Sequence, residues 1–121
     1  MMLTLYVYQG CSTCRDAVKW LRDRSIAFEE HAIRETTPTV EELQQMLDSK
    51  VQLRALFNTS GMEYRAQGLK DKLPGFTSEE AFQLLRSNGM LVKRPFALDP
   101  ARGVFLLGFK EAEWAKALTA P

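Results

Sequence analysis

The sequence predicts an α/β fold in which helices pack on a mixed sheet, and three observations lead to this prediction. The apolar run of residues 3–8 is followed by the helical pattern of residues 12–24. A second strand pattern covers residues 25–33, which completes a β-α-β unit with parallel strands. Near the other end of the chain, residues 96–107 read as strand, turn and strand, the pattern of a β-hairpin. A parallel unit and an antiparallel hairpin in one sheet make that sheet mixed.

The first strand and the first helix have the clearest local patterns. Residues 3–8 are apolar on both faces, which is typical of a central strand covered by helices. Gln9 and Gly10 then break the strand. The helix is expected over residues 12–24, with a buried stripe of Ala17, Val18, Trp20 and Leu21. In the second strand, we expect His31 to lie on the solvent side rather than to act as a ligand.

The middle of the chain is predicted to be helical. Residues 39–42 and 77–80 each match the capping box Thr-x-x-Glu in front of an apolar stripe. Shorter helical segments are expected over residues 53–57 and 64–73, on either side of the turn-forming residues 58–61. These patterns place a helical insertion at about residues 39–88.

Strand character returns in the last third of the chain. It appears at residues 90–92 and again on both sides of a turn at 99–103. A final helix is expected over residues 111–118, burying Trp114, Ala117 and Leu118. With two cysteines directly after the first strand, this order of elements indicates a thioredoxin-like core. We predict a single domain over residues 1–121 that carries the helical insertion.

Composition and charge exclude several functions. Of the 121 residues, 45% are hydrophobic and 26% are charged, as in ordinary soluble proteins. The chain has sixteen basic and fifteen acidic residues, and it lacks the basic stripe that direct nucleic-acid binding requires. No apolar stretch approaches the roughly 20 residues of a membrane span, and we recognise no signal peptide. We expect a cytoplasmic protein whose cysteines start reduced.

Cys11 and Cys14 are the most informative residues of the chain. They lie three residues apart, where the first strand gives way to the first helix. A helix start offers unpaired N–H groups and the positive end of the helix dipole, and both favour a thiolate. The second sulfur is close enough to attack a disulfide or adduct formed on the first. The motif therefore predicts redox chemistry with both cysteines in the catalytic site.

Three other uses of the cysteine pair compete with redox chemistry. A structural disulfide would close a loop of only four residues, which stabilises by on the order of 2 kcal/mol. Zinc needs about four ligands, and the chain offers no third cysteine and a single histidine, His31, so we expect no metal site. A chance proximity of two unconnected cysteines stays open as the third reading.

Four further residues are candidates for substrate binding: Arg94, Asn58, Ser12 and Arg15. If the chain around Arg94 runs beside the Cys11 loop, a cis peptide before Pro95 would shape a groove wall. Arg94 would then hold an anionic substrate or a thiolate through its fixed donor fork. The alternative is an exposed arginine next to an ordinary turn proline. Arg15 would stabilise the thiolate or simply project from the helix, and Asn58 lies in a turn that could be a binding loop or plain surface.

The sequence resembles the family that joins glutaredoxin-coupled, ArsC-like arsenate reductases to the Spx-type transcription regulators. The matching stretches occur in the family's order and spread over nearly the whole chain: residues 11–15, 56–65, 89–96 and 108–111. The resemblance implies a thioredoxin-like domain with a helical insertion between its second and third strands. It also implies that Cys11 is the nucleophile and that Arg94 belongs to an anion-binding group near it.

The chain departs from the reductases of this family at three places. Asn58 stands where they carry a second arginine, and the segment 108–110 (Gly-Phe-Lys) stands where they carry a third. A doubly charged oxyanion would lose two of its three charge-assisted guanidinium contacts here, because Lys110 offers a point charge and no fork. The reductases also generally lack a second cysteine at the place of Cys14, whereas Spx-type regulators use one in a disulfide switch.

These observations predict a thiol–disulfide redox protein of the arsenate reductase-like family. Cys11 would attack an oxyanion or a disulfide, and Cys14 would resolve the intermediate. We expect no bound cofactor and an external thiol, glutathione or glutaredoxin, as electron donor. The alternative is an Spx-like redox-sensing regulator that binds the RNA polymerase α subunit, since near-neutral charge suits protein–protein contact better than DNA or membrane binding.

Overall fold

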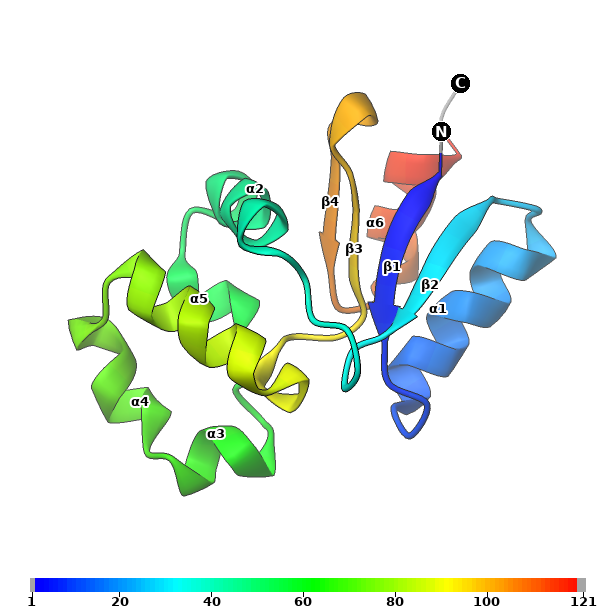
Figure 1. The fold of residues 1–121 in the computed structure, drawn as a ribbon. Helices are drawn as coiled ribbons and strands as arrows, with labels where there is room; N and C mark the ends of the chain where they lie inside the picture. Colours follow the sequence, from blue (N-terminus) through cyan, green and yellow to red (C-terminus); the bar gives the residue numbers. More distant parts are fainter. Residues whose placement is uncertain (1, 120–121) are drawn as a thin grey trace. The chain divides into compact units, whose positions relative to one another are not determined.

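The computed structural model describes residues 2–119, which form two compact units (Figure 1). The first unit contains the chain up to Ala32 together with the chain from Arg94 onward. The second unit is Ile33–Lys93 and includes the segment expected as a helical insertion.

The first unit is built on a four-stranded mixed sheet with the strand order β2-β1-β3-β4. Strands β1 (Leu3–Val7) and β2 (Phe28–Ala32) are parallel, as the β-α-β pattern predicts. Strand β3 (Phe96–Asp99) runs antiparallel to β1 and forms a hairpin with β4 (Val104–Leu107). The predicted α/β class with a mixed sheet is confirmed.

Two helices, α1 (Ser12–Asp23) and α6 (Glu111–Leu118), share one hydrophobic core with this sheet. Alternate residues of β1 point into that core, because successive strand residues face opposite sides of a sheet. The buried members from the strands and helices pack as one cluster: Leu3, Leu5, Val7, Cys14, Ala17, Trp20, Leu21, Ala97, Val104, Leu106 and Trp114. Tyr6 lies on the other face of the sheet, stacked on the His31 ring at 4.9 Å.

The second unit consists of short helices. These are α2 (Val40–Lys50), α3 (Met62–Ala66), α4 (Leu69–Lys72) and α5 (Ser78–Ser87), with 3₁₀ turns at Leu53–Leu56, Leu73–Gly75 and Gly89–Leu91. Both predicted capping boxes are confirmed. The Thr39 and Thr77 side chains each accept a hydrogen bond from a glutamate amide three residues on, and the glutamate carboxylates accept from the threonine amides.

The sequence-based boundaries are wrong at several places. The helix expected over residues 64–73 is broken at Gly68, whose φ of 63° is left-handed. Where a strand is expected at 90–92, residues up to Leu91 form a 3₁₀ turn, in which the Asn88 side chain caps the Met90 amide at 2.9 Å. Only Val92 is extended, and it forms an isolated antiparallel bridge with Phe57. The close approach of the Ile33 carbonyl to Gly89 leaves no room for a side chain there.

Two further expectations fail at the ends of elements. Strand β2 begins only at Phe28, because Ser25 adopts a positive φ of 55° and the Ile26 amide still bonds the Leu21 carbonyl. In α6, Trp114 is buried as expected but Ala117 is exposed. Within residues 2–119, no helix has both the length and the apolar character needed to cross a membrane.

Candidate thiol site

Cys11 occupies the N-cap position of α1. A turn after β1 brings it there, with the Cys11 amide donating to the Tyr8 carbonyl at 3.0 Å. Its backbone is extended (φ −95°, ψ 114°), as is usual for an N-cap residue. Its carbonyl accepts the first hydrogen bond of the helix, from the Arg15 backbone amide at 3.1 Å. The Cys11 sulfur accepts a hydrogen bond from the Cys14 amide at 3.3 Å. At the N-caps of most helices, a side-chain oxygen of serine, threonine or aspartate accepts this bond.

The surroundings of Cys11 favour its thiolate. Burial alone would raise the pKa of this half-buried thiol. Hydrogen bonds from the thiol and the amide of Cys14 act in the opposite direction, because they stabilise the charged form. A hydrogen bond from the Thr13 side chain and the positive charge of Arg94 add to them, so the pKa of Cys11 lies below its ordinary value.

Cys14 has the opposite character. It lies on the core face of α1 and is only 1% exposed. Burial raises the pKa of Cys14 to about 12, and its hydrogen bond to Cys11 acts in the same direction. A backbone hydrogen bond from Tyr8 offsets only part of this effect. Both cysteines are free thiols, so the site holds one half-buried sulfur with a lowered pKa and one buried sulfur with a raised pKa.

Arg94 belongs to the first unit and precedes β3. Its guanidinium lies over the Tyr8 ring, 5.5 Å from the ring centroid, and its charge acts on both sulfurs. The peptide bond between Arg94 and Pro95 is cis. The structure thus brings Arg94 together with Cys11 and Cys14, and the substrate-binding role of Arg94 stays a prediction.

The other candidate residues are placed as follows. Ser12 is exposed in the first turn of α1. The exposed Arg15 side chain turns back and donates to the Gln9 carbonyl at 2.8 Å. Asn58 lies in the second unit, where its backbone amide donates to the Leu91 carbonyl at 2.8 Å. No observation tests what these three residues bind.

The resemblance implies an arginine in the reductases at the segment Gly108-Phe109-Lys110. In this chain, Gly108 and Phe109 make packing contacts and a hydrogen bond within the first unit. The Phe109 ring packs edge-on against Trp114 at 5.1 Å and Trp20 at 6.1 Å. The Gly108 carbonyl accepts from the Trp114 indole at 3.0 Å, and the Gly108 backbone is left-handed. Lys110 is exposed at the start of α6. An aromatic ring therefore packs into the first unit next to Lys110.

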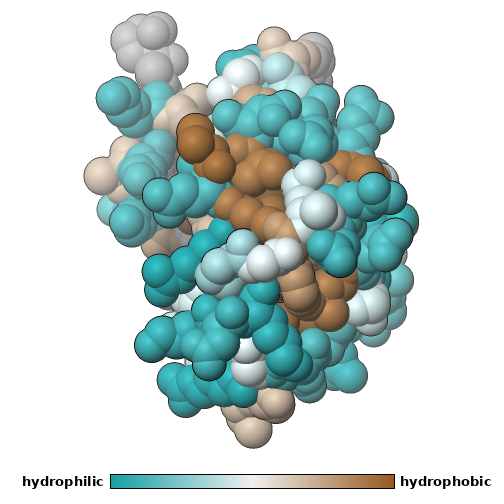
Figure 2. Space-filling model, turned by 90° about the vertical axis from the view of Figure 1, so that its left-hand side faces the viewer, coloured by the Kyte–Doolittle hydropathy of each residue, from teal (hydrophilic) through white to brown (hydrophobic). Residues whose placement is uncertain are grey.

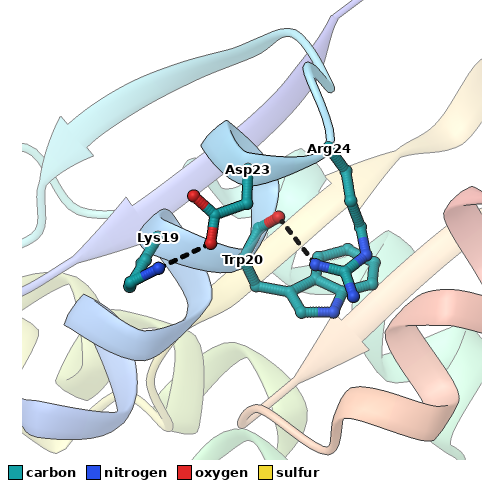
Figure 3. Close-up of polar contacts among 4 residues, drawn as sticks. All are labelled: Lys19, Trp20, Asp23 and Arg24. Carbon is teal, nitrogen blue, oxygen red and sulfur yellow. Dashed lines mark hydrogen bonds and ion pairs between the residues drawn. The ribbon is translucent and has the colours of Figure 1, made fainter.

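At the C-terminal end of α1, Arg24 lies against Trp20, one of the rings of this aromatic cluster (Figure 3). The Arg24 guanidinium lies 4.3 Å from the centroid of the Trp20 ring and donates to the Trp20 carbonyl at 3.4 Å. On the neighbouring turn, Lys19 pairs with Asp23 at 2.6 Å. The indole nitrogen of Trp20 is buried with no hydrogen-bond partner among residues 2–119.

A groove of about 610 Å³ opens beside Cys14 in the first unit. Its lining mixes apolar and charged side chains, and the charged ones come from both α1 and β2: Val7, Tyr8, Gln9, Cys14, Arg15, Val18, Lys19, Arg22, Asp23, Glu30 and Ala32. The two acids lie near basic partners, since Lys19 pairs with Asp23 and Arg22 lies 3.9 Å from Glu30. In the part of the chain that is described, no three His, Cys, Asp or Glu side chains gather as a metal site.

The second unit has a groove of its own, of about 550 Å³. It is lined by Gln52, Leu53, Arg54, Tyr64, Lys70, Leu73, Pro74 and Phe76. Val51, directly before it in the chain, is 82% exposed and has an unusual positive φ of 72°. Figure 2, which looks onto the side of Figure 1 where α2, α4 and α5 lie, shows apolar residues gathered on this face.

Comparison with known proteins identifies the family and the fold of this chain. The chain belongs to the ArsC family, whose family model matches residues 6–117. It is 43% identical over 115 residues to the protein YusI of Bacillus subtilis (strain 168), across 94% of this chain and 96% of YusI. It is 31% identical over 113 residues to the global transcriptional regulator Spx of Streptococcus agalactiae serotype V, across 93% of this chain and 80% of Spx.

A solved structure bears out the fold. A crystal structure of an ArsC family related protein from Bacteroides fragilis matches with a TM-score of 0.87 at 40% identity, covering 97% of this chain and 98% of that one. The predicted thioredoxin-like fold and the resemblance to the ArsC-like and Spx-type family are therefore confirmed. Because the relatives include a transcriptional regulator, membership alone does not assign an activity.

Sequence reasoning missed two residues of the site. The strand pattern places Tyr8 as the last residue of the first strand, and Phe109 lies in the segment 108–110 where the resemblance implies an arginine. The signal for Tyr8 was its distance of three residues from Cys11, which suits a turn that returns the chain to the helix start. The signal for Phe109 was the presence of two tryptophans, Trp20 and Trp114, one on each flanking helix.

Proposed function

We propose that this protein is a thiol–disulfide redox protein in which Cys11 attacks and Cys14 resolves. One observation carries the proposal: the two sulfurs at the start of α1 differ in exposure and in acidity. Cys11 is accessible with a lowered pKa, and Cys14 is buried with a raised one. A nucleophile must be ionised and reachable, whereas a resolving thiol has to be protected until an adduct has formed.

In the first step, the Cys11 thiolate attacks one sulfur of a substrate disulfide. A new S–S bond forms between Cys11 and that sulfur, the substrate S–S bond breaks, and the other substrate sulfur leaves as a thiolate. The helix start and Arg94 stabilise the Cys11 thiolate before attack, since both supply positive potential at the sulfur. Cys14 does not compete, because its proton is retained.

In the second step, Cys14 gives its proton to solvent and the resulting thiolate attacks the Cys11 sulfur. Two of the influences that raise the pKa of Cys14 come from Cys11, namely a hydrogen bond and the negative charge. Both end when the Cys11 sulfur enters a disulfide, so adduct formation itself lowers the pKa of Cys14 towards the range where it reacts. The Cys11–Cys14 disulfide forms, and the second substrate thiolate leaves.

The cycle is completed by an external thiol. Two electrons have passed from the protein to the substrate disulfide, which leaves as two thiols. We propose that two molecules of glutathione, or one dithiol such as glutaredoxin, return these electrons and become oxidised to a disulfide. The chemistry needs no bound cofactor, because the electrons are carried by sulfur throughout.

A disulfide suits this site better than arsenate does. Among the positions that the reductases fill with arginines, this chain keeps Arg94 and carries Asn58 at another. At the third, Phe109 packs against the tryptophans and the exposed Lys110 supplies a single point charge. A doubly charged oxyanion lacks the forked donors that would hold it.

The test compares two reductase assays on the same reduced protein. We expect reduction of insulin or of a small aromatic disulfide with glutathione as donor, and slower or no reduction of arsenate with glutathione and glutaredoxin. Cys11→Ser abolishes turnover, and Cys14→Ser accumulates a glutathione adduct on Cys11. Ser49→Ala, an exposed change in the second unit, serves as the matched control and keeps full activity. Disulfide reduction by Cys11→Ser would overturn the proposal.

A second candidate function is a redox-sensing regulator of the Spx type. The 31% identity to Spx supports it, as does the apolar groove of the second unit, whose charged lining residues are the basic Arg54 and Lys70. In this reading the Cys11–Cys14 disulfide alters binding to the RNA polymerase α subunit. A pull-down with that subunit, using reduced and oxidised protein, separates the two functions, and absence of binding in both states removes this one.

A further inference from the structure

We propose that Tyr8 is a positioning residue, whose aromatic ring holds the Arg94 guanidinium beside Cys11 while its backbone fixes both cysteines. The inference rests on the proposed function, in which Cys11 is the attacking thiol. It adds a residue outside the cysteine motif and outside the arginine positions that the family resemblance implies.

The backbone of Tyr8 meets both cysteines. Its carbonyl accepts from the Cys11 amide at 3.0 Å, which closes the turn between β1 and α1. A backbone hydrogen bond from Tyr8 also reaches the Cys14 sulfur. One residue therefore sets the place of the attacking thiol and of the resolving thiol, and these bonds are independent of its side chain.

The ring of Tyr8 makes the contact with Arg94. The guanidinium carbon lies 5.5 Å from the ring centroid, within the range of about 6 Å over which a cation is attracted to an aromatic face. An arginine is charged at every physiological pH, so its effect on a thiol depends only on where the guanidinium is held. Arg94 is among the groups that favour the Cys11 thiolate, and the ring limits where Arg94 can go.

Gly10 explains why the ring can lie there. A Cβ atom at residue 10 would stand 2.7 Å from Cε2 of the Tyr8 ring, closer than two carbons can approach. Any side chain at this position would displace the ring. Gly10 lies directly before Cys11, so the glycine and the tyrosine form one arrangement around the thiol. The small residue is required by close packing rather than by an unusual backbone angle.

The experiment measures the pH dependence of Cys11 alkylation by iodoacetamide on the full-length reduced protein, with Cys11 identified by peptide mass spectrometry. Tyr8→Leu should raise the alkylation midpoint by about 0.5 pH unit, so that the rate at pH 7 falls about threefold. Tyr8→Phe keeps the aromatic face and should stay within about 0.2 pH unit of the natural chain.

A double-substitution cycle separates positioning from a general structural effect. Arg94→Gln should itself raise the midpoint, by about 0.5 to 1 pH unit. When Tyr8→Leu is added to Arg94→Gln, no further rise is expected, because the ring then has no cation to hold. An undiminished effect of Tyr8→Leu in the Arg94→Gln background would overturn the inference. So would a Tyr8→Phe effect as large as that of Tyr8→Leu.

A second variant protects the test against misfolding. If Tyr8→Leu does not fold, Gly10→Ala displaces the ring without removing it and should raise the midpoint in the same direction. An unchanged midpoint in Gly10→Ala would count against the inference. Alkylation needs no substrate, so it also separates this inference from the proposed function. A midpoint that depends on Tyr8 and Arg94 in a protein that reduces no disulfide would refute the function and keep the positioning role.

Discussion

The first turn of any helix has backbone N–H groups without a partner in the helix, and α1 caps them with a different side chain from α2 and α5. Helices α2 and α5 each begin with a threonine cap and two glutamates in the first turn, of which the second is the reciprocal partner of the threonine. Helix α1 begins with the Cys11 sulfur as its cap and continues with Ser12, Thr13 and Cys14 in place of acids. Sulfur is a weaker acceptor than oxygen, so α1 has the poorer cap for stability.

The difference shows where the chain gives up helix stability for reactivity. Acidic side chains in a first turn neutralise the positive end of the helix dipole. At α2 and α5 they do so, and those helix starts are stabilised. At α1 the positive end is left for the Cys11 thiolate, and Arg94 adds to it. The caps of the second unit are structural, whereas the cap of α1 is the reactive group itself.

The largest effect is expected when the cap of α1 keeps its shape and loses its sulfur. Cys11→Ser replaces the thiol by a good N-cap oxygen, so disulfide reduction should fall to the uncatalysed rate. The free energy of unfolding should change by less than about 1 kcal/mol. Reductase assays and urea denaturation of the same sample measure both. A large loss of stability would show that Cys11 is mainly structural.

The next effect is an alkaline loss of stability that originates in the first turn of α1. The pKa of Cys14 is raised to about 12 in the folded state, above the value of about 8.5 in an unfolded chain. Its contribution is therefore complete below the unfolded value and is lost as the pH rises towards the folded one. We expect the free energy of unfolding to fall by up to about 1.4 kcal/mol per pH unit in this window.

Urea denaturation between pH 8 and 11 measures this slope. Cys14→Ala, which has no proton to lose, should show a shallower slope over the same range, whatever its absolute stability. The lowered pKa of Cys11 acts in the opposite sense, since its contribution is present above the unfolded value and is lost on acidification. Equal slopes for the natural chain and Cys14→Ala would contradict a protonated Cys14.

A smaller effect is expected at the two threonine caps. Thr39→Ala or Thr77→Ala removes the oxygen that accepts from the glutamate amide, at 3.1 Å in both boxes. Each should cost about 1 kcal/mol of stability and leave the pH profile of Cys11 alkylation unchanged. Thr36→Ala, in the exposed turn before α2, is the matched control. A shifted alkylation profile would show that these caps are not purely structural.

The smallest effect comes from giving α1 the acid that the other helices have. Ser12→Glu should stabilise the helix start by a few tenths of a kcal/mol. The same charge should raise the Cys11 alkylation midpoint and slow the reaction at pH 7 by about twofold to threefold. Ser12→Gln has the same size without the charge and should leave the midpoint in place. If both variants behave alike, the dipole and its neutralisation do not matter for Cys11.

Local chemistry decided which elements the sequence could reveal. The capping boxes at Thr39 and Thr77 are predicted correctly because the threonine and glutamate that form each box are only three residues apart in the chain. The β-hairpin was found because a turn separates two apolar runs. The strand prediction for 90–92 is wrong at Met90 and Leu91, where the Asn88 side chain caps the Met90 amide and the Ile33 carbonyl lies against the preceding Gly89. A contact with Ile33, distant in sequence, cannot be read from the apolar run itself.

The thiol site shows the same difference between features set by neighbouring residues and features set by residues distant in sequence. The cysteine pair could be predicted because spacing and position after a strand already define it. The meeting of Arg94 with Tyr8 and Cys11 depends on β3 pairing with β1, which brings together residues more than 80 positions apart in the sequence. The packing of Phe109 depends on two helices meeting. Both needed the three-dimensional structure.

The most direct test of the redox assignment is site-resolved alkylation of Cys11 and Cys14 across pH on the reduced protein. We predict that Cys11 is modified with a midpoint below that of a free cysteine, while Cys14 stays unmodified until strongly alkaline pH. Modification of both cysteines with the same midpoint, or of Cys14 before Cys11, would contradict an ionised nucleophile paired with a protected resolving thiol.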